Sequence, residues 1–240
     1  MAIDLLDKRE VRIRRMFGEI APWYDFLNHF LSLNIDRRWR STVARRVPPI
    51  GTDPILDLCT GTGDLALTYD RASGGTVPIV AADFCHEMLV RAAQKVERAK
   101  AANRIRIVEA DAQHLPFPDA TFQLVTNSFG LRNITDPDLG LREMIRVAKP
   151  GGRIAILEFS KPRQRHLRTL YLGYFRSILP RIGQAFCRNE DEAYKYLPES
   201  VLKFPDGEAM LSKLRENGLE DVAEFPLTFG IATLYVGRKP

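Results

Sequence analysis

Three acidic residues stand at the ends of short apolar runs, and they are the first side chains that could do chemistry. Asp57 lies in "ILDLC", just before the turn "TGTGD", while Asp83 ends "VPIVAAD" and Asp111 ends "RIRIVEAD". If these runs are strands of one parallel sheet, their ends lie at the same edge. Three carboxylates at three successive strand ends, next to a glycine-rich turn, favour a site that accepts hydrogen bonds from a ligand.

The glycine-rich turn has two interpretations. Gly61 and Gly63 allow positive φ angles and a close approach of the backbone to a ligand, and the following helix offers free N–H groups. With Ala66 they also match the dinucleotide pattern G-x-G-x-x-A, with Asp83 where a ribose-binding acid is expected, so a nicotinamide enzyme has to be considered. A buried carboxylate is costly unless it is paired, so Asp57 is predicted to hold the glycine loop or to meet a cationic ligand.

The segment "TNSFGLRNITD", residues 126–136, follows another apolar run and is more specific than a connection requires. It places an aromatic residue, a glycine, Arg132 and Asn133 in a row. We expect Gly130 to let the chain bend after Phe129, so that Arg132 and Asn133 reach a ligand.

The elements that must position these residues can be read from periodicity. The first 50 residues are helical in pattern, with "PWYDFLNHFLSL" carrying apolar residues at helical spacing. Strands and helices then alternate, which predicts an α/β fold: a doubly wound, mostly parallel, seven-stranded sheet. We predict a single domain over residues 1–240. A helical N-terminal extension (1–50) is expected to cover the site, and a helical insertion (161–200) is expected on the side of the site where a second substrate, the acceptor, would bind.

Composition sets broad limits. An apolar content of 45% and a charged content of 27% are typical of a soluble globular protein. The net charge of +5 is compatible with an anionic ligand, a membrane surface or nucleic acid. The three cysteines are far apart and form no C-x-x-C pair, so neither a disulfide framework nor a metal site is expected. With no signal segment and no apolar run long enough to span a bilayer, a cytoplasmic location is expected.

Taken together, the motifs resemble those of class I S-adenosylmethionine-dependent methyltransferases. More narrowly, the chain resembles the quinone-biosynthesis C-methyltransferases that methylate demethylmenaquinol or a polyprenyl methoxy-benzoquinol. The resemblance extends from about residue 14 to the C-terminus. It is carried by these stretches: "MFGEIAPWYDFLNHFLSLNIDRRWR", "LDLCTGTGDLAL", "ADFCHEML", "DAQHLPFPDATFQLVTNSFGLRNITD", "REMIRVAKPGGRIAILEFSKP" and "YLPESVLKFPDGEAM". Cys59 departs from the superfamily pattern, where many members have a glycine.

The resemblance implies S-adenosylmethionine as co-substrate and a set of residues that line it, together with the glycine loop and Asp57. Thr62 would contact the amino-acid end, Asp83 the ribose hydroxyls, Asp111 and Ala112 the adenine, and Ser128 would stand beside the sulfonium. Phe84 would cover one face of the adenine, although a core phenylalanine is an equally good interpretation.

The implied reaction needs a nucleophilic ring carbon but no metal. A phenolic pKa near ~10 leaves on the order of one quinol in a thousand ionised at pH 7, and a nearby arginine can lower such a pKa by ~1–3 units. Arg132 is suited to that task, Asn133 could orient the same oxygen, and Tyr24 could face the ring. His29, His114 or a water relayed by Arg132 or Tyr24 remain alternatives for the general base, and no catalytic histidine is assigned.

Other functions and partners fit these motifs less well. A methyltransferase acting on nucleic-acid amino groups usually carries a Pro-Pro-aromatic motif where this chain has "NSFG", so no nucleic-acid partner is expected. A hydride-transfer constellation is not found, and a non-catalytic binding module would not need an intact cofactor loop. Between Lys161 and Arg181 there are six basic residues and no acid, with apolar residues at helical spacing. This segment is either a helix packed on the sheet or one that contacts anionic lipid. A homodimer is left open, and demethylmenaquinol is the preferred acceptor.

Overall fold

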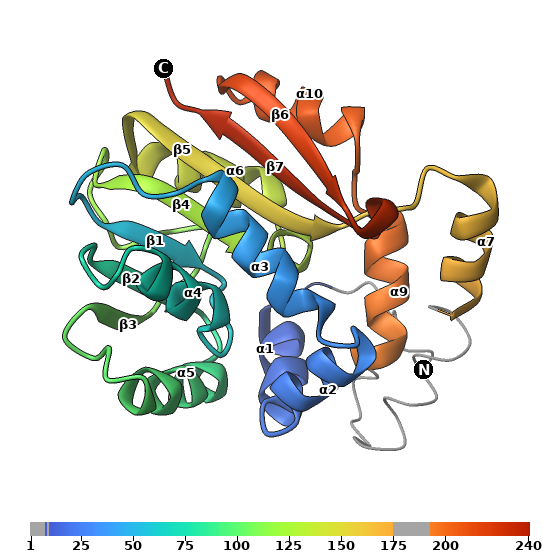
Figure 1. Ribbon diagram of the computed structural model, residues 1–240, viewed down its shortest axis with the longest axis horizontal. Helices are drawn as coiled ribbons and strands as arrows, with labels where there is room; N and C mark the ends of the chain where they lie inside the picture. Colours follow the sequence, from blue (N-terminus) through green and yellow to red (C-terminus); the bar gives the residue numbers. More distant parts are fainter. Residues whose placement is uncertain (1–7, 9, 175–192) are drawn as a thin grey trace.

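The computed structural model describes residues 8, 10–174 and 193–240 of the chain (Figure 1). Its centre is a seven-stranded sheet in the order β3-β2-β1-β4-β5-β7-β6, in which β7 runs antiparallel to both neighbours. The strands are β1 (Ile55–Leu58), β2 (Ile79–Asp83), β3 (Ile105–Glu109), β4 (Phe122–Ser128), β5 (Ala148–Phe159), β6 (Glu220–Leu227) and β7 (Ala232–Arg238). The predicted doubly wound, mostly parallel sheet is confirmed.

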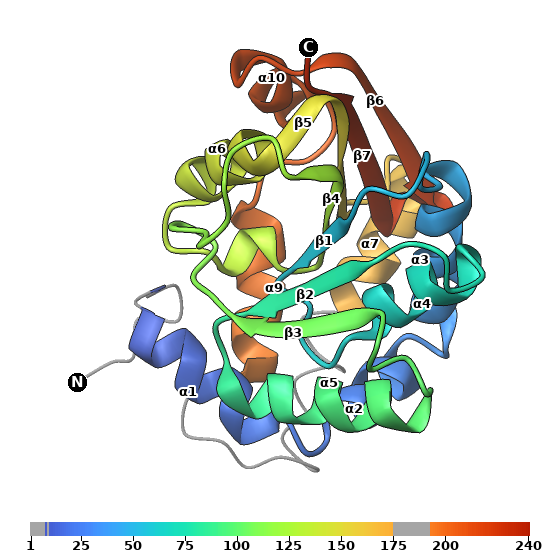
Figure 2. The same ribbon diagram turned by 90° about the vertical axis from the view of Figure 1, so that its left-hand side faces the viewer.

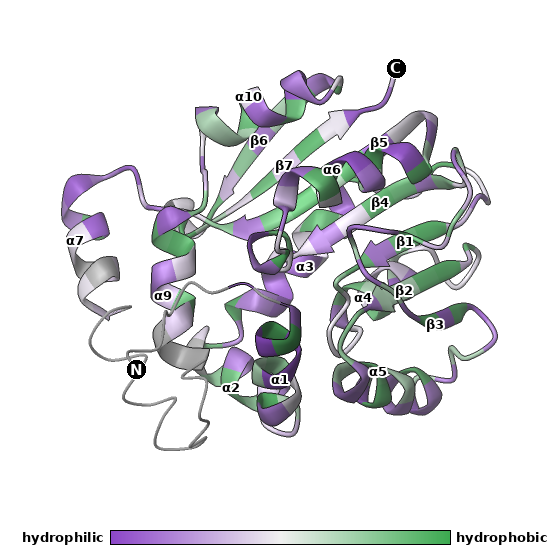
Figure 3. Ribbon diagram, turned by 180° about the vertical axis from the view of Figure 1, so that it is seen from behind, coloured by the Kyte–Doolittle hydropathy of each residue, from purple (hydrophilic) through white to green (hydrophobic). Residues whose placement is uncertain are grey.

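Helices cover both faces of this sheet because the inner strands are apolar on both sides (Figures 2 and 3). All four residues of β1 are buried, with Leu56 and Leu58 in one core and Ile55 in the other. Helices α6 (Pro137–Val147) and α10 (Glu208–Glu216) fill the first core. Helices α3 (Ile35–Arg46), α4 (Asp64–Ala72) and α5 (His86–Arg98) fill the second.

A third core joins the N-terminal helices to the segment after β5. Helices α1 (Glu10–Ile20) and α2 (Tyr24–Leu31) pack with α7 (Arg165–Gly173) and α9 (Ala193–Lys203) through residues such as Ile13, Leu27, Tyr171 and Tyr196. Figure 1 shows α1, α2 and α9 gathered beside the end of the sheet toward which the parallel strands point. The extension and the insertion therefore meet over the edge where a parallel sheet binds its ligands.

Part of the basic segment between Lys161 and Arg181, namely residues 175–181, lies outside the described residues. Among the helices that are described, none has both the length and the apolar character needed to cross a membrane.

Candidate functional site

A cleft opens at the carboxyl ends of the parallel strands. It is lined by apolar side chains with a few convergent polar groups, as small-molecule sites commonly are. Seven of the predicted site residues line it: Tyr24, Gly61, Asp83, Asp111, Ala112, Ser128 and Asn133. The others, Asp57, Thr62, Gly63 and Arg132, lie behind its wall.

Asp57 holds the glycine loop, which is the first of its two predicted roles. The carboxylate accepts hydrogen bonds from the Thr60 hydroxyl (2.6 Å), the Ala66 amide (3.1 Å) and the Thr126 hydroxyl (3.0 Å). Thr126 is its partner in the register between β1 and β4. Burial raises the pKa of Asp57 to about 6 in spite of these bonds. Its contribution to the cleft is therefore to fix the path of the loop.

The loop itself has a left-handed backbone at three positions, with φ of 54° at Cys59, 57° at Gly61 and 83° at Gly63. Only the glycines adopt this conformation at little cost. Gly61 also leaves room on the cleft side, where a Cβ would meet only Tyr24, at 3.8 Å. Gly63 lies against α5 instead, since a Cβ there would lie 3.3 Å from that of Ala92.

Asp83 is the best-placed carboxylate in the cleft. It is 7% exposed, and each of its oxygens accepts one backbone N–H, from Gly61 (2.8 Å) and from Cys85 (2.9 Å). Burial raises its pKa, and the backbone hydrogen bonds oppose that rise. Because a carboxylate offers about four lone-pair positions, Asp83 keeps acceptor capacity for hydroxyl groups in the cleft.

Asp111 is held at the far end of the cleft by its own turn. Its oxygens accept the Gln113 amide at 2.9 Å and pair with His114 Nδ1 at 3.2 Å. Burial acts to raise the pKa of Asp111, but these hydrogen bonds outweigh it and keep the pKa below its usual value. Gln113 and Glu10 join this end of the cleft, linked at 3.4 Å between Gln113 Nε2 and Glu10 Oε1.

Thr62 points away from the cleft, contrary to the role implied by the resemblance. Its hydroxyl donates to Asp25 at 2.5 Å and accepts from Lys95 at 3.1 Å. Lys95 also pairs with Asp25 at 2.8 Å and with Asp64. The side chain thus ties α2 to the glycine loop, because the nearest charged groups lie on that side of the loop. Only the backbone of Thr62 remains to face a ligand.

The segment after β4 forms the wall opposite α2. Ser128 lines the cleft with a buried hydroxyl oxygen that has no hydrogen-bond partner. The bend occurs at Phe129, whose φ is 61°, while Gly130 has an ordinary φ of −107°. The prediction that Gly130 provides the bend is therefore wrong. Glycine is required at this position for another reason, because a side chain there would collide with the Cβ of Cys59 and crowd Asn127.

Arg132 lies behind this wall. Its side chain is 6% exposed and pairs with Glu158 at 2.8 Å, and its Nη1 also donates to the Phe129 carbonyl at 2.6 Å. The guanidinium lies over the Phe159 ring, 5.3 Å from the centroid, and its Nε is buried with no partner. Arg132 does not swing into the cleft as the sequence suggested, since Glu158 supplies a buried counter-charge on the other side.

Asn133 and Tyr24 face the cleft from opposite elements. Asn133 Nδ2 donates to the Phe129 carbonyl at 3.2 Å, and its Oδ1 accepts from the Tyr196 hydroxyl at 3.0 Å. Burial raises the pKa of Tyr24, so its phenol stays protonated near neutrality. Neither His29 nor His114 lines the cleft.

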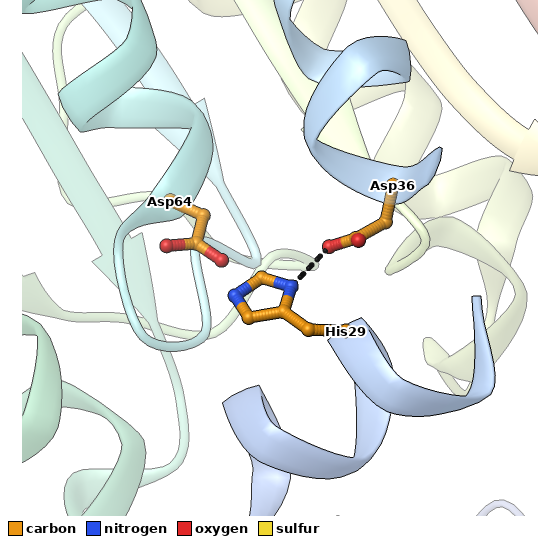
Figure 4. Close-up of side chains that lie close together, drawn as sticks. All are labelled: His29, Asp36 and Asp64. Atoms are coloured by element: carbon orange, nitrogen blue, oxygen red, sulfur yellow. Dashed lines mark hydrogen bonds and ion pairs between the residues drawn. The ribbon is translucent and has the colours of Figure 1, made fainter. Parts of the chain in front are cut away.

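A cluster behind the cleft has ligand atoms close enough to suggest a metal, namely His29, Asp36 and Asp64 (Figure 4). His29 Nδ1 lies 2.8 Å from Asp36, and Arg40 Nη1 lies 2.6 Å from the same carboxylate and 3.9 Å from Asp64. Lys95 pairs with Asp64 from the other side. Arginine and lysine thus already supply the positive charge, and the cluster is an ion-pair network that joins α2, α3 and α4.

Several lining residues were missed by sequence reasoning because they come from the N-terminal segment that docks over the sheet: Lys8, and Glu10, Ile13 and Phe17 of α1. Glu158 and Tyr196 were also missed, although neither lines the cleft. For Glu158 a signal existed, since an acid within the apolar run "IAILEF" needs a buried partner. No local pattern marks Tyr196.

Comparison with known proteins agrees with this geometry. The profile of the ubiE/COQ5 methyltransferase family matches residues 5–239. The chain belongs to that family. A curated relative from Geobacter sp. (strain M21), a ubiquinone/menaquinone biosynthesis C-methyltransferase UbiE, is 46% identical over 234 residues, which is 98% of this chain and 99% of the relative. A demethylmenaquinone methyltransferase from Deinococcus radiodurans is 43% identical over 236 residues, covering 98% and 95% of the two chains.

The same fold is found in a solved structure of low sequence identity. A SAM-dependent methyltransferase from Aquifex aeolicus has a TM-score of 0.61 and 18% sequence identity, and the match covers 84% of this chain and 89% of that one. At this identity the likeness speaks for the fold, which is the methyltransferase sheet expected from the sequence.

Proposed function

We propose that the protein transfers a methyl group from S-adenosylmethionine to a ring carbon of a reduced polyprenyl quinol, with demethylmenaquinol as the acceptor. The observation that carries the proposal is that one cleft at the carboxyl ends of the strands is lined both by carboxylates and by hydroxyl and amide groups. The carboxylates are Asp83 and Asp111, and the other groups are Ser128, Asn133 and Tyr24. The names of the relatives support the class of acceptor.

The residues present fit the co-substrate. Asp83 keeps lone pairs for two ribose hydroxyls, and Asp111 with the Ala112 amide faces the end where an adenine would lie. The unpartnered Ser128 hydroxyl oxygen supports a ligand between these groups and the acceptor end. When bound, S-adenosylmethionine supplies an electrophilic methyl group, and the protein's task is to hold a nucleophilic carbon in line with it.

The acceptor end is built to polarise a quinol oxygen. Asn133 Nδ2 has one N–H directed to Phe129 and a second one to offer, and the protonated Tyr24 phenol can donate from α2. Both donors would stabilise the phenolate that forms when a quinol hydroxyl loses its proton to solvent, and this ionisation makes the ring carbon nucleophilic. The negative charge on the oxygen then falls as the carbon takes the methyl group, and the ring hydrogen leaves to solvent as a proton.

Arg132 acts in this proposal as a positioning residue. Its charge is balanced by Glu158, so it cannot lower the pKa of a quinol as a free guanidinium would. It instead holds the Phe129 carbonyl that also receives Asn133, and thereby fixes the wall that faces the acceptor.

Peripheral membrane contact is part of the proposal because a polyprenyl substrate resides in lipid. Within α7, Tyr171 packs into the third core while Arg165 and Arg168 are exposed, which gives the helix one packed side and one basic side. A basic exposed side next to an apolar core is suited to an anionic membrane surface.

The deciding experiment offers the purified protein demethylmenaquinol and a polyprenyl methoxy-benzoquinol, each with methyl-labelled S-adenosylmethionine, and identifies the products by mass. We expect ring methylation of demethylmenaquinol. The second acceptor is the alternative, because the Geobacter relative is named for both quinones. Binding of S-adenosylmethionine without methyl transfer to either quinol would refute the proposed class of acceptor but would still support the cofactor site.

A further inference from the structure

The amide of Asn133 is held by two partners, and together they leave one orientation. The Phe129 carbonyl oxygen, 3.2 Å away, can only accept a hydrogen bond, so the atom that faces it must be Nδ2. The other amide atom is therefore Oδ1, and it faces the Tyr196 hydroxyl at 3.0 Å. Tyr196 must then be the donor.

Tyr196 is itself fixed on α9. Its side chain is 2% exposed in the third core, and the Arg12 guanidinium lies 6.0 Å from its ring centroid. Burial raises the pKa of Tyr196 to about 12, so its hydroxyl keeps the proton it donates. Tyr196 does not line the cleft, whereas Asn133 does.

We propose that Tyr196 is a positioning residue for methyl transfer: by donating to Asn133 Oδ1, it holds the Asn133 amide so that an N–H faces the acceptor oxygen. This inference rests on the proposed function. It assigns α9, which comes from a distant part of the chain, a role in the reaction beyond covering the cleft. A bond to Oδ1 also polarises the amide and strengthens the remaining N–H as a donor.

The test is a double-mutant cycle on Tyr196→Phe and Asn133→Ala, with kcat measured per cofactor-binding site from a titration with S-adenosylmethionine. Tyr196→Phe keeps the packed ring and removes only the hydroxyl. The loss of one hydrogen bond of ordinary strength should lower kcat by about tenfold, with the KM for S-adenosylmethionine within about twofold of the wild type. In the Asn133→Ala background the same change should alter kcat by less than about twofold, because its partner is gone.

Tyr69→Phe is the matched control. Tyr69 is a fully buried tyrosine whose hydroxyl donates to the Val47 carbonyl at 3.1 Å, and it does not line the cleft. It should lower the melting temperature as Tyr196→Phe does and leave kcat unchanged.

The outcomes separate the inference from the proposed function. A wild-type protein that methylates no quinol overturns both. An active wild type in which Tyr196→Phe keeps full kcat, or lowers it by the same factor in both backgrounds, overturns the role of Tyr196 alone.

Discussion

Replacing Asp57 by asparagine should make the protein more stable near neutral pH, although it removes a charge from the cofactor loop. Asp57 is 1% exposed, and among the described residues no cation lies within ion-pair distance of it. Burial raises its pKa from 3.8 to about 6. At about 1.4 kcal/mol for each pH unit, this difference means that ionised Asp57 costs the folded protein about 3 kcal/mol at pH 7.

The direction in which the stability changes with pH follows from proton binding to Asp57. A raised pKa means that the folded state binds the proton more tightly than the unfolded state does. Asp57 therefore costs no stability below pH 3.8, costs progressively more as the pH rises to 6, and costs a constant amount above that.

Asparagine can keep the local hydrogen bonds. Its Oδ1 would accept from Thr60 and Ala66, as one carboxylate oxygen does now. Its Nδ2 would donate to the Thr126 hydroxyl, which would then donate to the Leu56 carbonyl, 3.3 Å away. The second N–H of Nδ2 would have no partner among these groups and would cost about 1 kcal/mol or more, so the gain in stability should be smaller than the full ionisation cost.

The assay is urea unfolding of both proteins at pH values from 4.5 to 8, with S-adenosylmethionine affinity measured by titration at pH 7.5. Between the acidic and the neutral end of this range, the stability difference should shift in favour of the asparagine variant by about 2 kcal/mol. Affinity should change by less than about threefold if Asp57 only holds the loop, since one hydrogen bond to a ligand would cost more. A variant that is less stable at every pH, or one whose affinity falls tenfold or more, would refute this reasoning.

Three further predictions concern the cleft and its surroundings. Asp83→Ala should weaken S-adenosylmethionine binding by at least about tenfold in a titration, because two ribose hydroxyls lose their acceptor, and an unchanged affinity would remove Asp83 from the site. Arg132→Ala should lower kcat by about tenfold or more, because the Phe129 carbonyl that also holds Asn133 loses a partner. It should also destabilise the fold by about 3–5 kcal/mol in urea unfolding, because Glu158 is left buried and unpaired. Arg132→Lys should not restore kcat, since an ammonium cannot reproduce the planar fork, and wild-type turnover in the lysine variant would show that a point charge suffices. Replacing Arg165 and Arg168 by glutamate should weaken salt-sensitive binding to vesicles rich in anionic lipid, and equal sedimentation of wild type and variant would rule out α7 as the contact.

The sheet and one half of the cleft could be predicted from the sequence because local spacing controls them. A parallel strand places the residues at and just after its carboxyl end at the ligand edge of the sheet. Asp83 ends β2 and Asp111 lies two residues after the end of β3, and both line the cleft. Ser128 ends β4 and does so for the same reason.

Partners across long sequence distances could not be predicted in this way. Arg132 finds Glu158 on the neighbouring strand, and Thr62 finds Asp25, 37 residues earlier in the chain. In each case the sequence shows a polar residue that needs a partner but not which of the available charges lies nearest. That choice depends on how β4 and β5 align and on how α2 docks, so the side chains turned away from the cleft although their neighbours line it.

What the sequence by itself determined is the chemistry available at the edge of the sheet: an anchored glycine loop, two carboxylates and an asparagine after β4. These features depend on residue type and on spacings of a few residues, which strand and turn geometry convert directly into position. Only the tertiary structure decided which of these groups turn toward the cleft and which turn away from it. Burial and proximity paired Arg132 with Glu158 and placed Tyr196 of α9 on Asn133, because a buried charge or amide takes the nearest partner that packing provides.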